Sequence, residues 1–319
     1  MRLADIVDLI CSKLGQNDPN TVSVAKKYVN MRYIQIYEMA TWFDSQFYYS
    51  VTMPTTGNLI LSPLIDRIMA VFNTASLYSL PNVQLGTLFR SQPALFNNVS
   101  SGQPIAYNEQ PPIACSQLPQ TAGVLTFVSS STQDNGLPIS LFGDLAGAEY
   151  IETVTCGGTT PVNSVNSYDT PYVIAKAPTW TGTLTVKDSN SNVINTVMPY
   201  ETERKYPRIT SISAPVQAQV YTILFKRKVD PLINDNDTPR LRNIDNALYS
   251  YGMADMLEFL RQFPTAAAKY QSEAEQFVQE AMEVEQSQQG NVAQIIPVPT
   301  GGWGVEDWGA NPWWDKQYF

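Results

Sequence analysis

The feature that most constrains the fold is the presence of amphipathic helical segments at both ends of the chain, with a long stretch rich in Thr, Ser, Asn and Gly between them. Residues 2–14 and about 21–47 repeat apolar side chains at steps of three and four, and the same repeat follows Pro239 and Pro264. Neither end has enough partners to bury its apolar stripe alone. We therefore expect the helices of both ends to pack around one shared core.

The middle of the chain has the pattern of β-strands. Within 124–197, short β-rich runs alternate with turn clusters, which predicts an inserted antiparallel β-sandwich. A further strand is expected at 220–229, where an apolar run ends in three basic residues, a pattern typical of a hairpin arm; these are Lys226, Arg227 and Lys228. The expected fold class is α+β: a helical bundle formed by the N- and C-terminal helices, with a β-hairpin, plus the inserted sandwich.

We expect three parts in the 319-residue chain. A discontinuous helical body with the hairpin comprises 1–115 and 206–289, the sandwich comprises 116–205, and an extended Trp-rich arm comprises 290–319. The aromatic residues of the arm are Trp303, Trp308, Trp313, Trp314, Tyr318 and Phe319. Two interpretations of the arm are open: its rings anchor in pockets of a neighbouring chain, or it has no role. Four exposed Trp side chains without a partner are costly, which favours the anchor.

Charge and composition exclude several classes of function. The net charge is −9 with a pI near 4.6, so we expect no tight nucleic-acid binding, although an acidic surface could line a channel through which DNA slides. No stretch approaches the roughly 20 continuous apolar residues of a membrane span, so we expect no membrane partner. The three cysteines lie far apart, which predicts neither a zinc knuckle nor a disulfide framework.

Catalytic chemistry has little support in the sequence. Histidine is absent, which removes the commonest general base and zinc ligand. Paired carboxylates remain, but solvated surface positions explain them better; the candidate pairs are Asp134 with Asp144 and Glu149 with Glu152. The run Asp235-Asn236-Asp237 resembles half of a calcium loop, and we expect it to cap the following helix instead. We predict no enzyme activity, no catalytic residue, no metal and no cofactor.

The order of features resembles the head-to-tail adaptor, or connector, proteins of tailed bacteriophages. Three places carry the resemblance: the N-terminal helix pair through Trp42-Phe43, the segment 89–93 with 102–107, and the C-terminal block that runs from 225–232 through 237–239 into the last helices. Together they cover about half of the chain. The strands of 124–197 depart from the pattern and are similar to the immunoglobulin-like insertions of many virion proteins.

The resemblance implies a virion structural protein that forms a homo-oligomeric ring, commonly twelvefold, between the portal and the tail. Its partners would be its own copies, the portal protein and a tail or nozzle protein. The Trp-rich arm would bind the portal, and the acidic face of the last helix would line or surround the DNA channel. Lys226, Arg227 and Lys228 would contact a subunit or the portal, or else form a solvated strand edge. The expected location is the neck or tail of the virion, after synthesis in the host cytoplasm.

Three alternatives stay open. The first is another tail ring or nozzle protein. The second is a carbohydrate-binding sandwich, in which Trp180, Tyr168 and Tyr172 would stack on sugar rings. The third is a glycosidase without histidine that uses the carboxylate pairs named above.

Overall fold

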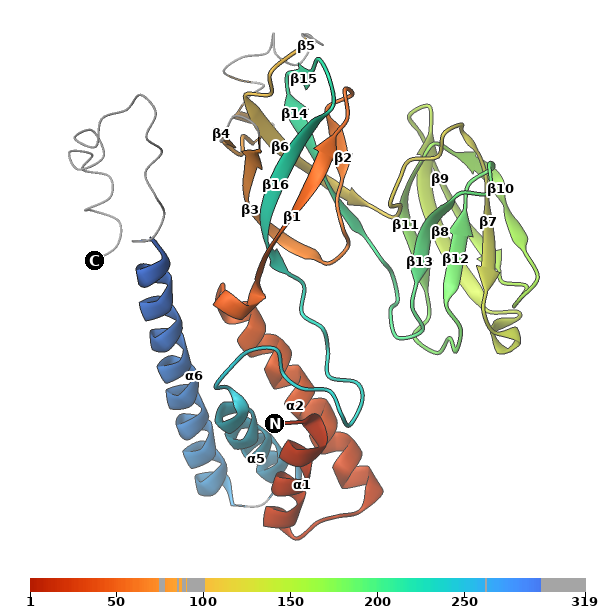
Figure 1. Cartoon of the computed structure of the whole chain (residues 1–319). Helices are drawn as coiled ribbons and strands as arrows, with labels where there is room; N and C mark the ends of the chain where they lie inside the picture. Colours follow the sequence, from red (N-terminus) through yellow and green to blue (C-terminus); the bar gives the residue numbers. More distant parts are fainter. Residues whose placement is uncertain (75–77, 85, 88–89, 91–100, 262, 294–319) are drawn as a thin grey trace, which may run out of the picture. The chain divides into compact units, whose positions relative to one another are not determined.

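The computed structural model describes residues 1–293 except 75–77, 85, 88–89, 91–100 and 262 (Figure 1). It contains both α-helices and antiparallel sheets, so the α+β class is confirmed. The chain forms two compact units. The helical unit is Met1–Ser45 together with the chain from Val229 onward, and the β unit is Gln46–Lys228.

The described part of the helical unit contains four α-helices, and local signals explain where several of them begin and end. Their bounds are α1 Leu3–Leu14, α2 Pro19–Met39, α5 Asp245–Phe259 and α6 Pro264–Ala293. Gly15 ends α1 in the left-handed conformation with φ 66°. Asp18 caps α2 by accepting hydrogen bonds of 3.0 Å from the amides of Asn20 and Thr21, and Pro19 occupies the first helical position.

Two helix boundaries differ from the prediction. Helix α2 stops at Met39 rather than near 47, because buried Trp42 folds back and its Nε1–H donates to the Ile36 carbonyl oxygen at 2.9 Å. The next residues enter a strand instead. Helix α5 begins at Asp245 and not at Pro239, because residues 229–243 run as an irregular segment whose Leu232 and Leu241 join the helical core.

Helices from the two ends of the chain share one buried cluster, and α5 packs against α1, α2 and α6. Ten of the fifteen residues of α5 are buried, so this helix is covered on nearly all sides. The closest approach is at Gly252, where an added Cβ would lie 2.5 Å from Ile10 Cδ1 and 3.2 Å from Val29 Cγ2. The expected common core is therefore present in the structure.

Polar contacts also join the two ends. The Arg32 guanidinium on α2 makes a two-pronged ion pair with Asp255 on α5, with Nε–Oδ2 at 2.8 Å and Nη2–Oδ1 at 2.6 Å. The first amides of α1 donate to the loop 235–237, from Leu3 to the Asp237 carbonyl at 2.8 Å. Asp237 itself accepts from the amides at 233 and 234, so this loop closes its own turn and caps α1 rather than α5.

The β unit contains two sheets that pair distant parts of the chain. The first has the order β1-β16-β3-β4, and the second has the order β2-β14-β6. Their bounds are β1 Gln46–Met53, β16 Gln219–Arg227, β3 Ile65–Asn73, β4 Tyr78–Leu80, β2 Asn58–Ile60, β14 Tyr206–Ile212 and β6 Ala106–Ile113. A short parallel pair joins β5 Ser101–Gly102 to β15 Ala214–Pro215. Strand β16 is paired on both sides, so the expected hairpin arm is instead an inner strand.

The same unit holds the expected inserted strands. Two antiparallel sheets, ordered β10-β7-β12-β13 and β11-β8-β9, share one buried core, which is the arrangement of a β-sandwich (Figure 1). Their bounds are β7 Gly123–Ser129, β8 Pro138–Leu145, β9 Ala148–Thr155, β10 Val162–Tyr168, β11 Thr170–Lys176, β12 Leu184–Lys187 and β13 Val193–Val197. Cys115 and Cys156 both lie buried in this core as free thiols.

The units do not follow the boundaries expected from the sequence. The contacts divide the chain after Ser45 and after Lys228, whereas we expected a body of 1–115 with 206–289. The physical reason is strand pairing: residues 46–113 and 206–227 hydrogen-bond to one another in the two sheets described above. These residues therefore belong with the β unit.

Candidate interaction surface

The residues predicted to bind a partner fall into two groups. The aromatic residues of the arm, Trp303, Trp308, Trp313, Trp314, Tyr318 and Phe319, lie outside the described residues. The three basic residues of 226–228 do not form one surface. Lys226 is buried with 5% of its surface exposed, the Arg227 guanidinium lies 5.8 Å from the centre of the Phe47 ring, and Lys228 is exposed.

The carboxylates considered for catalysis take separate structural positions. Asp134 is buried in the turn that precedes β8, whereas Asp144 lies near the other end of β8, directly opposite Glu149 on β9. Glu152 holds the edge of β10, because its carboxylate accepts from the amides of Val165 at 3.1 Å and Asn166 at 2.9 Å. These contacts give Asp134 and Glu152 roles in holding the sandwich together.

Asp134 accepts four hydrogen bonds within the sandwich. Its Oδ1 accepts from the Thr181 amide at 2.9 Å and the Thr181 hydroxyl at 3.0 Å, and its Oδ2 accepts from the Gly182 amide at 2.9 Å and the Ser129 hydroxyl at 2.5 Å. Burial by itself would raise the pKa of Asp134, but these hydrogen bonds outweigh it and lower the pKa. The side chain is therefore an anionic clamp between the turn at 129–134 and the start of β12.

The aromatic residues proposed to stack on sugars are mostly covered. Tyr168 is fully buried and Trp180 is 3% exposed, while Tyr172 is partly buried against Phe142 with ring centres 5.5 Å apart. The Lys176 ammonium lies 5.6 Å from the centre of the Trp180 ring. The rings of Tyr168 and Trp180 are thus covered by the protein itself, and Tyr172 alone of the three keeps partial exposure.

Negative charge is concentrated in the helical unit. Residues 46–228 contain 10 acidic and 10 basic residues, whereas 1–45 with 229–293 contain 16 acidic and 9 basic residues. Helix α6 contributes strongly, because its described side chains include five glutamates and one lysine, Lys269. The net negative charge of the described chain therefore belongs to the helical unit.

The glutamates of α6 are held mainly by glutamine rather than by basic side chains. Three Gln side chains donate to the Glu one turn later, from Gln271 to Glu275 at 3.2 Å, from Gln276 to Glu280 at 3.0 Å and from Gln279 to Glu283 at 3.3 Å. A neutral amide orders a carboxylate but leaves its charge in place. Helix α6 therefore presents ordered negative charge on its exposed side.

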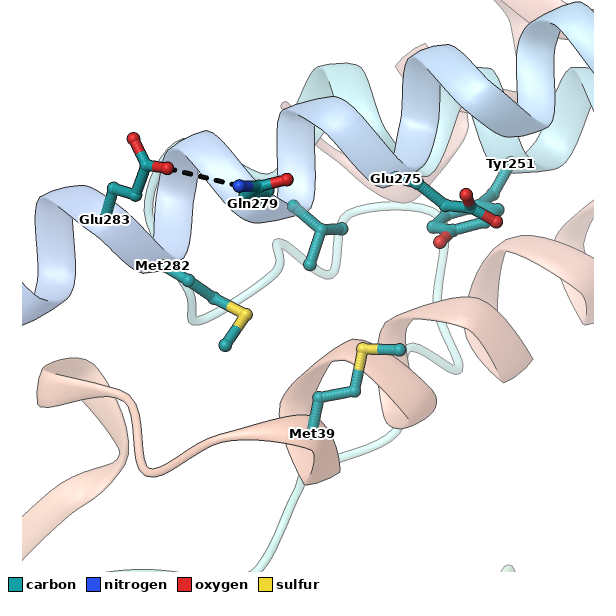
Figure 2. A pocket seen from close by; sticks show the side chains of 7 residues that line it. Met39, Tyr251, Glu275, Gln279, Met282 and Glu283 are labelled. Atoms are coloured by element: carbon teal, nitrogen blue, oxygen red, sulfur yellow. Dashed lines mark hydrogen bonds between the residues drawn. The ribbon is translucent and has the colours of Figure 1, made fainter.

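A groove of about 400 Å³ lies between α6 and the end of α2 (Figure 2). Met39 on α2 and Met282 on α6 point toward one another across it. Val278 and Tyr251 contribute further apolar surface, and Glu275, Gln279 and Glu283 of α6 complete the lining. This part of the molecule, called the methionine groove below, combines flexible apolar walls with an acidic border.

The Arg32–Asp255 ion pair lies beside Tyr251, one of the residues that line the methionine groove. The Arg32 guanidinium lies 4.7 Å from the centre of the Tyr251 ring, so it stacks on the aromatic side chain that lines the groove. Burial raises the pKa of the Tyr251 hydroxyl, and the nearby Glu275 charge raises it further. The Arg32 guanidinium pairs with Asp255, so it does not neutralise the glutamates at the border of the groove.

A second groove of about 670 Å³ lies in the β unit, along the β2-β14-β6 sheet. Arg208 is the one charged residue among the described residues that line it, and its Nε–H donates to the Pro111 carbonyl at 2.9 Å. Asn58, Gln110 and Thr210 add neutral polar groups. This surface mixes apolar and neutral polar side chains and is nearly uncharged, in contrast to the acidic border of the methionine groove.

Comparisons with known proteins do not identify the chain: no protein-family model matches it, and no curated protein matches it. None of the helices in the described part of the chain combines the length and apolar character needed to cross a membrane. Within the same residues, no three His, Cys, Asp or Glu side chains are grouped so as to hold a metal ion.

Proposed function

We propose that this chain is a virion structural protein, a head-to-tail adaptor that forms a ring between the portal and the tail of a tailed bacteriophage. In this proposal, α1, α2, α5 and α6 form the helical bundle that repeats around the ring, and the chain acts through interfaces without catalysis. The family resemblance of the sequence is the starting point, and the shared core of the terminal helices supports it.

The observation that carries the proposal is the net negative charge on α6, whose described side chains include five glutamates and one lysine, Lys269, which pairs with Glu273 at 3.6 Å. A protein that lines a DNA path must let the duplex slide, and an acidic wall avoids the counterion release that makes basic surfaces bind phosphates. Glu273 and Glu280 lie seven residues apart and hence on one side of the helix. In the ring, this side of α6 would face the channel, and the twelvefold symmetry common in the family would repeat it around the DNA.

The location at the neck or tail of the virion follows from this assignment. The partners would be further copies of the chain, the portal protein and a tail or nozzle protein. The Trp-rich arm would anchor on the portal, as the sequence suggests. Another tail ring or nozzle protein is a related alternative that shares the ring and the acidic channel but not the portal contact.

The test is native mass spectrometry of the full chain mixed with the portal protein of the same virus. The proposal expects a complex with one fixed number of chain copies per portal ring, which matches the symmetry of a closed assembly. Free monomers under every assembly condition would contradict it. A ring that forms alone and binds only tail proteins would replace the adaptor assignment with the nozzle alternative.

A further inference from the structure

Exposed apolar side chains gather at the end of the helical unit that holds the methionine groove. Met39 is 61% exposed, Phe43 is 43% exposed and Val284 is 45% exposed. The Phe43 amide donates to the Glu285 carboxylate at 2.7 Å, which brings the turn after α2 against the same part of α6. Clustered apolar exposure next to a groove is the mark of a surface that binds another molecule.

The chemistry of the methionine groove restricts the kind of molecule. Methionine side chains are flexible and polarisable, so a wall built from Met39 and Met282 adapts to apolar groups of varied shape. Among the described residues that line the groove, two are acidic and none is basic. The occupant should therefore present apolar side chains together with positive charge.

We propose that the methionine groove binds a basic amphipathic segment of another protein. Its apolar side chains enter between Met39 and Met282, while its Lys or Arg side chains lie over Glu275 and Glu283. The mode is that of an amphipathic helix in a groove.

Charge complementarity selects this occupant over a second copy of the chain. A second copy would bring another helical unit with 16 acidic and 9 basic residues in its described part, which opposes the acidic border of the groove. The proposal does not depend on the ring. A monomeric chain could bind such a segment, and a ring could form without it, so the two proposals fail separately.

The probe is a synthetic 15-residue peptide with Leu on one helical face and Lys on the other, blocked at both ends and carrying a fluorescent label. Fluorescence anisotropy with the full chain is expected to show saturable binding that weakens as salt is added. A peptide with the same composition in scrambled order is expected to bind at least about tenfold more weakly, because its apolar face is lost. A peptide with Glu in place of Lys is expected not to bind.

Matched variants locate the binding site. The double variant Glu275→Gln/Glu283→Gln removes two charges from the border, and it is expected to weaken binding about tenfold. The control Glu273→Gln/Glu280→Gln removes the same charge from the same helix outside the groove lining, and it is expected to change binding less than about twofold. Met39→Ala tests the apolar wall, and we expect this variant to fold because the Met39 side chain is exposed.

Four outcomes would overturn the proposal. The first is absence of binding by the Leu/Lys peptide, and the second is equal binding by the scrambled peptide. The third is an equal effect of the two double variants, which would reduce the interaction to general attraction by an acidic helix. Self-association of the chain that Met39→Ala abolishes would show that a second copy occupies the groove, and this result would also contradict the occupant proposed here.

Discussion

Replacing Asp134 by Asn tests whether a buried anion holds the sandwich together. The carboxylate accepts four hydrogen bonds from Ser129, Thr181 and Gly182, two of them from backbone amides. An Asn side chain keeps one acceptor oxygen and turns an NH2 group toward the other set of donors. At least one buried amide then loses its acceptor, at a cost of about 1–3 kcal/mol, and the remaining bonds lose their charge-assisted strength. We expect the free energy of unfolding to fall by about 3 kcal/mol at pH 7.

The pH dependence of this loss follows from the lowered pKa of Asp134. Because the folded-state pKa lies below the ordinary value of 3.8, the anion stabilises the fold above pH 3.8 and this contribution is lost as pH falls through the folded-state pKa. The stability difference between wild type and Asp134→Asn should therefore be largest near neutral pH and shrink in acid.

Urea unfolding of the full chain is the assay, followed by hydrogen exchange of peptides that cover β7 and β12 and measured at several pH values. The control is Glu149→Gln, which removes an exposed carboxylate from the same sandwich and should stay within about 0.5 kcal/mol of wild type. Equal stability of wild type and Asp134→Asn at pH 7, or a difference that persists unchanged in strong acid, would contradict the stabilising role of the Asp134 anion.

Three further predictions concern the two cores. Arg32→Ala leaves the Asp255 carboxylate buried without its ion pair and should lower the free energy of unfolding of the helical unit by about 3–5 kcal/mol in urea. Arg32→Lys should lower it less. Equal losses of stability in the two variants would contradict the two-pronged contact. Gly252→Ala forces Ile10 Cδ1 to move and should destabilise the helical unit by about 1 kcal/mol. In an Ile10→Val background, which lacks that methyl group, Gly252→Ala should instead stabilise the unit by up to about 1 kcal/mol. If Gly252→Ala destabilises the protein in both backgrounds, the close packing of α1 on α5 is excluded. Burial raises the pKa of Cys115 to about 12, and all three cysteine thiols are buried. A thiol reagent at pH 8 should therefore label the native chain slowly, but the unfolded chain at three sites. Fast labelling of the native chain would contradict the burial of the thiols.

Much of the local structure could be predicted from the sequence because its signals are local. The steps of three and four in 2–14 and the stop at Gly15 predicted α1 closely, and Pro264 marks the start of α6. Turn clusters at short spacing predicted the inserted strands. In each case the deciding residues lie within a few positions of one another, so no tertiary information was needed.

Features that depend on how the chain folds back on itself were missed. Trp42 ends α2 through a contact made only when the chain folds back, and the apolar residues that follow it misled the prediction of the helix end. Strand β16 becomes an inner strand through pairing with β1 and β3, far earlier in the chain, which changes the surroundings of Lys226. The basic run alone could not show that this lysine is buried.

The methionine groove could not be predicted for the same reason. Met39 and Met282 lie near opposite ends of the chain, and neither stands out in its own segment. The acidic character of α6 was visible in the sequence, and it is the part of the candidate surface that sequence reasoning found. Predicting the groove requires knowing that α6 lies beside the end of α2.

The most direct test of the proposed role is a cryo-electron microscopy reconstruction of the particle that carries this chain. We expect a rotationally symmetric ring at the neck in which the side of α6 that bears Glu273 and Glu280 faces the central channel. Density that places the chain on the outside of the particle, or that turns this side of α6 away from the DNA path, would contradict it.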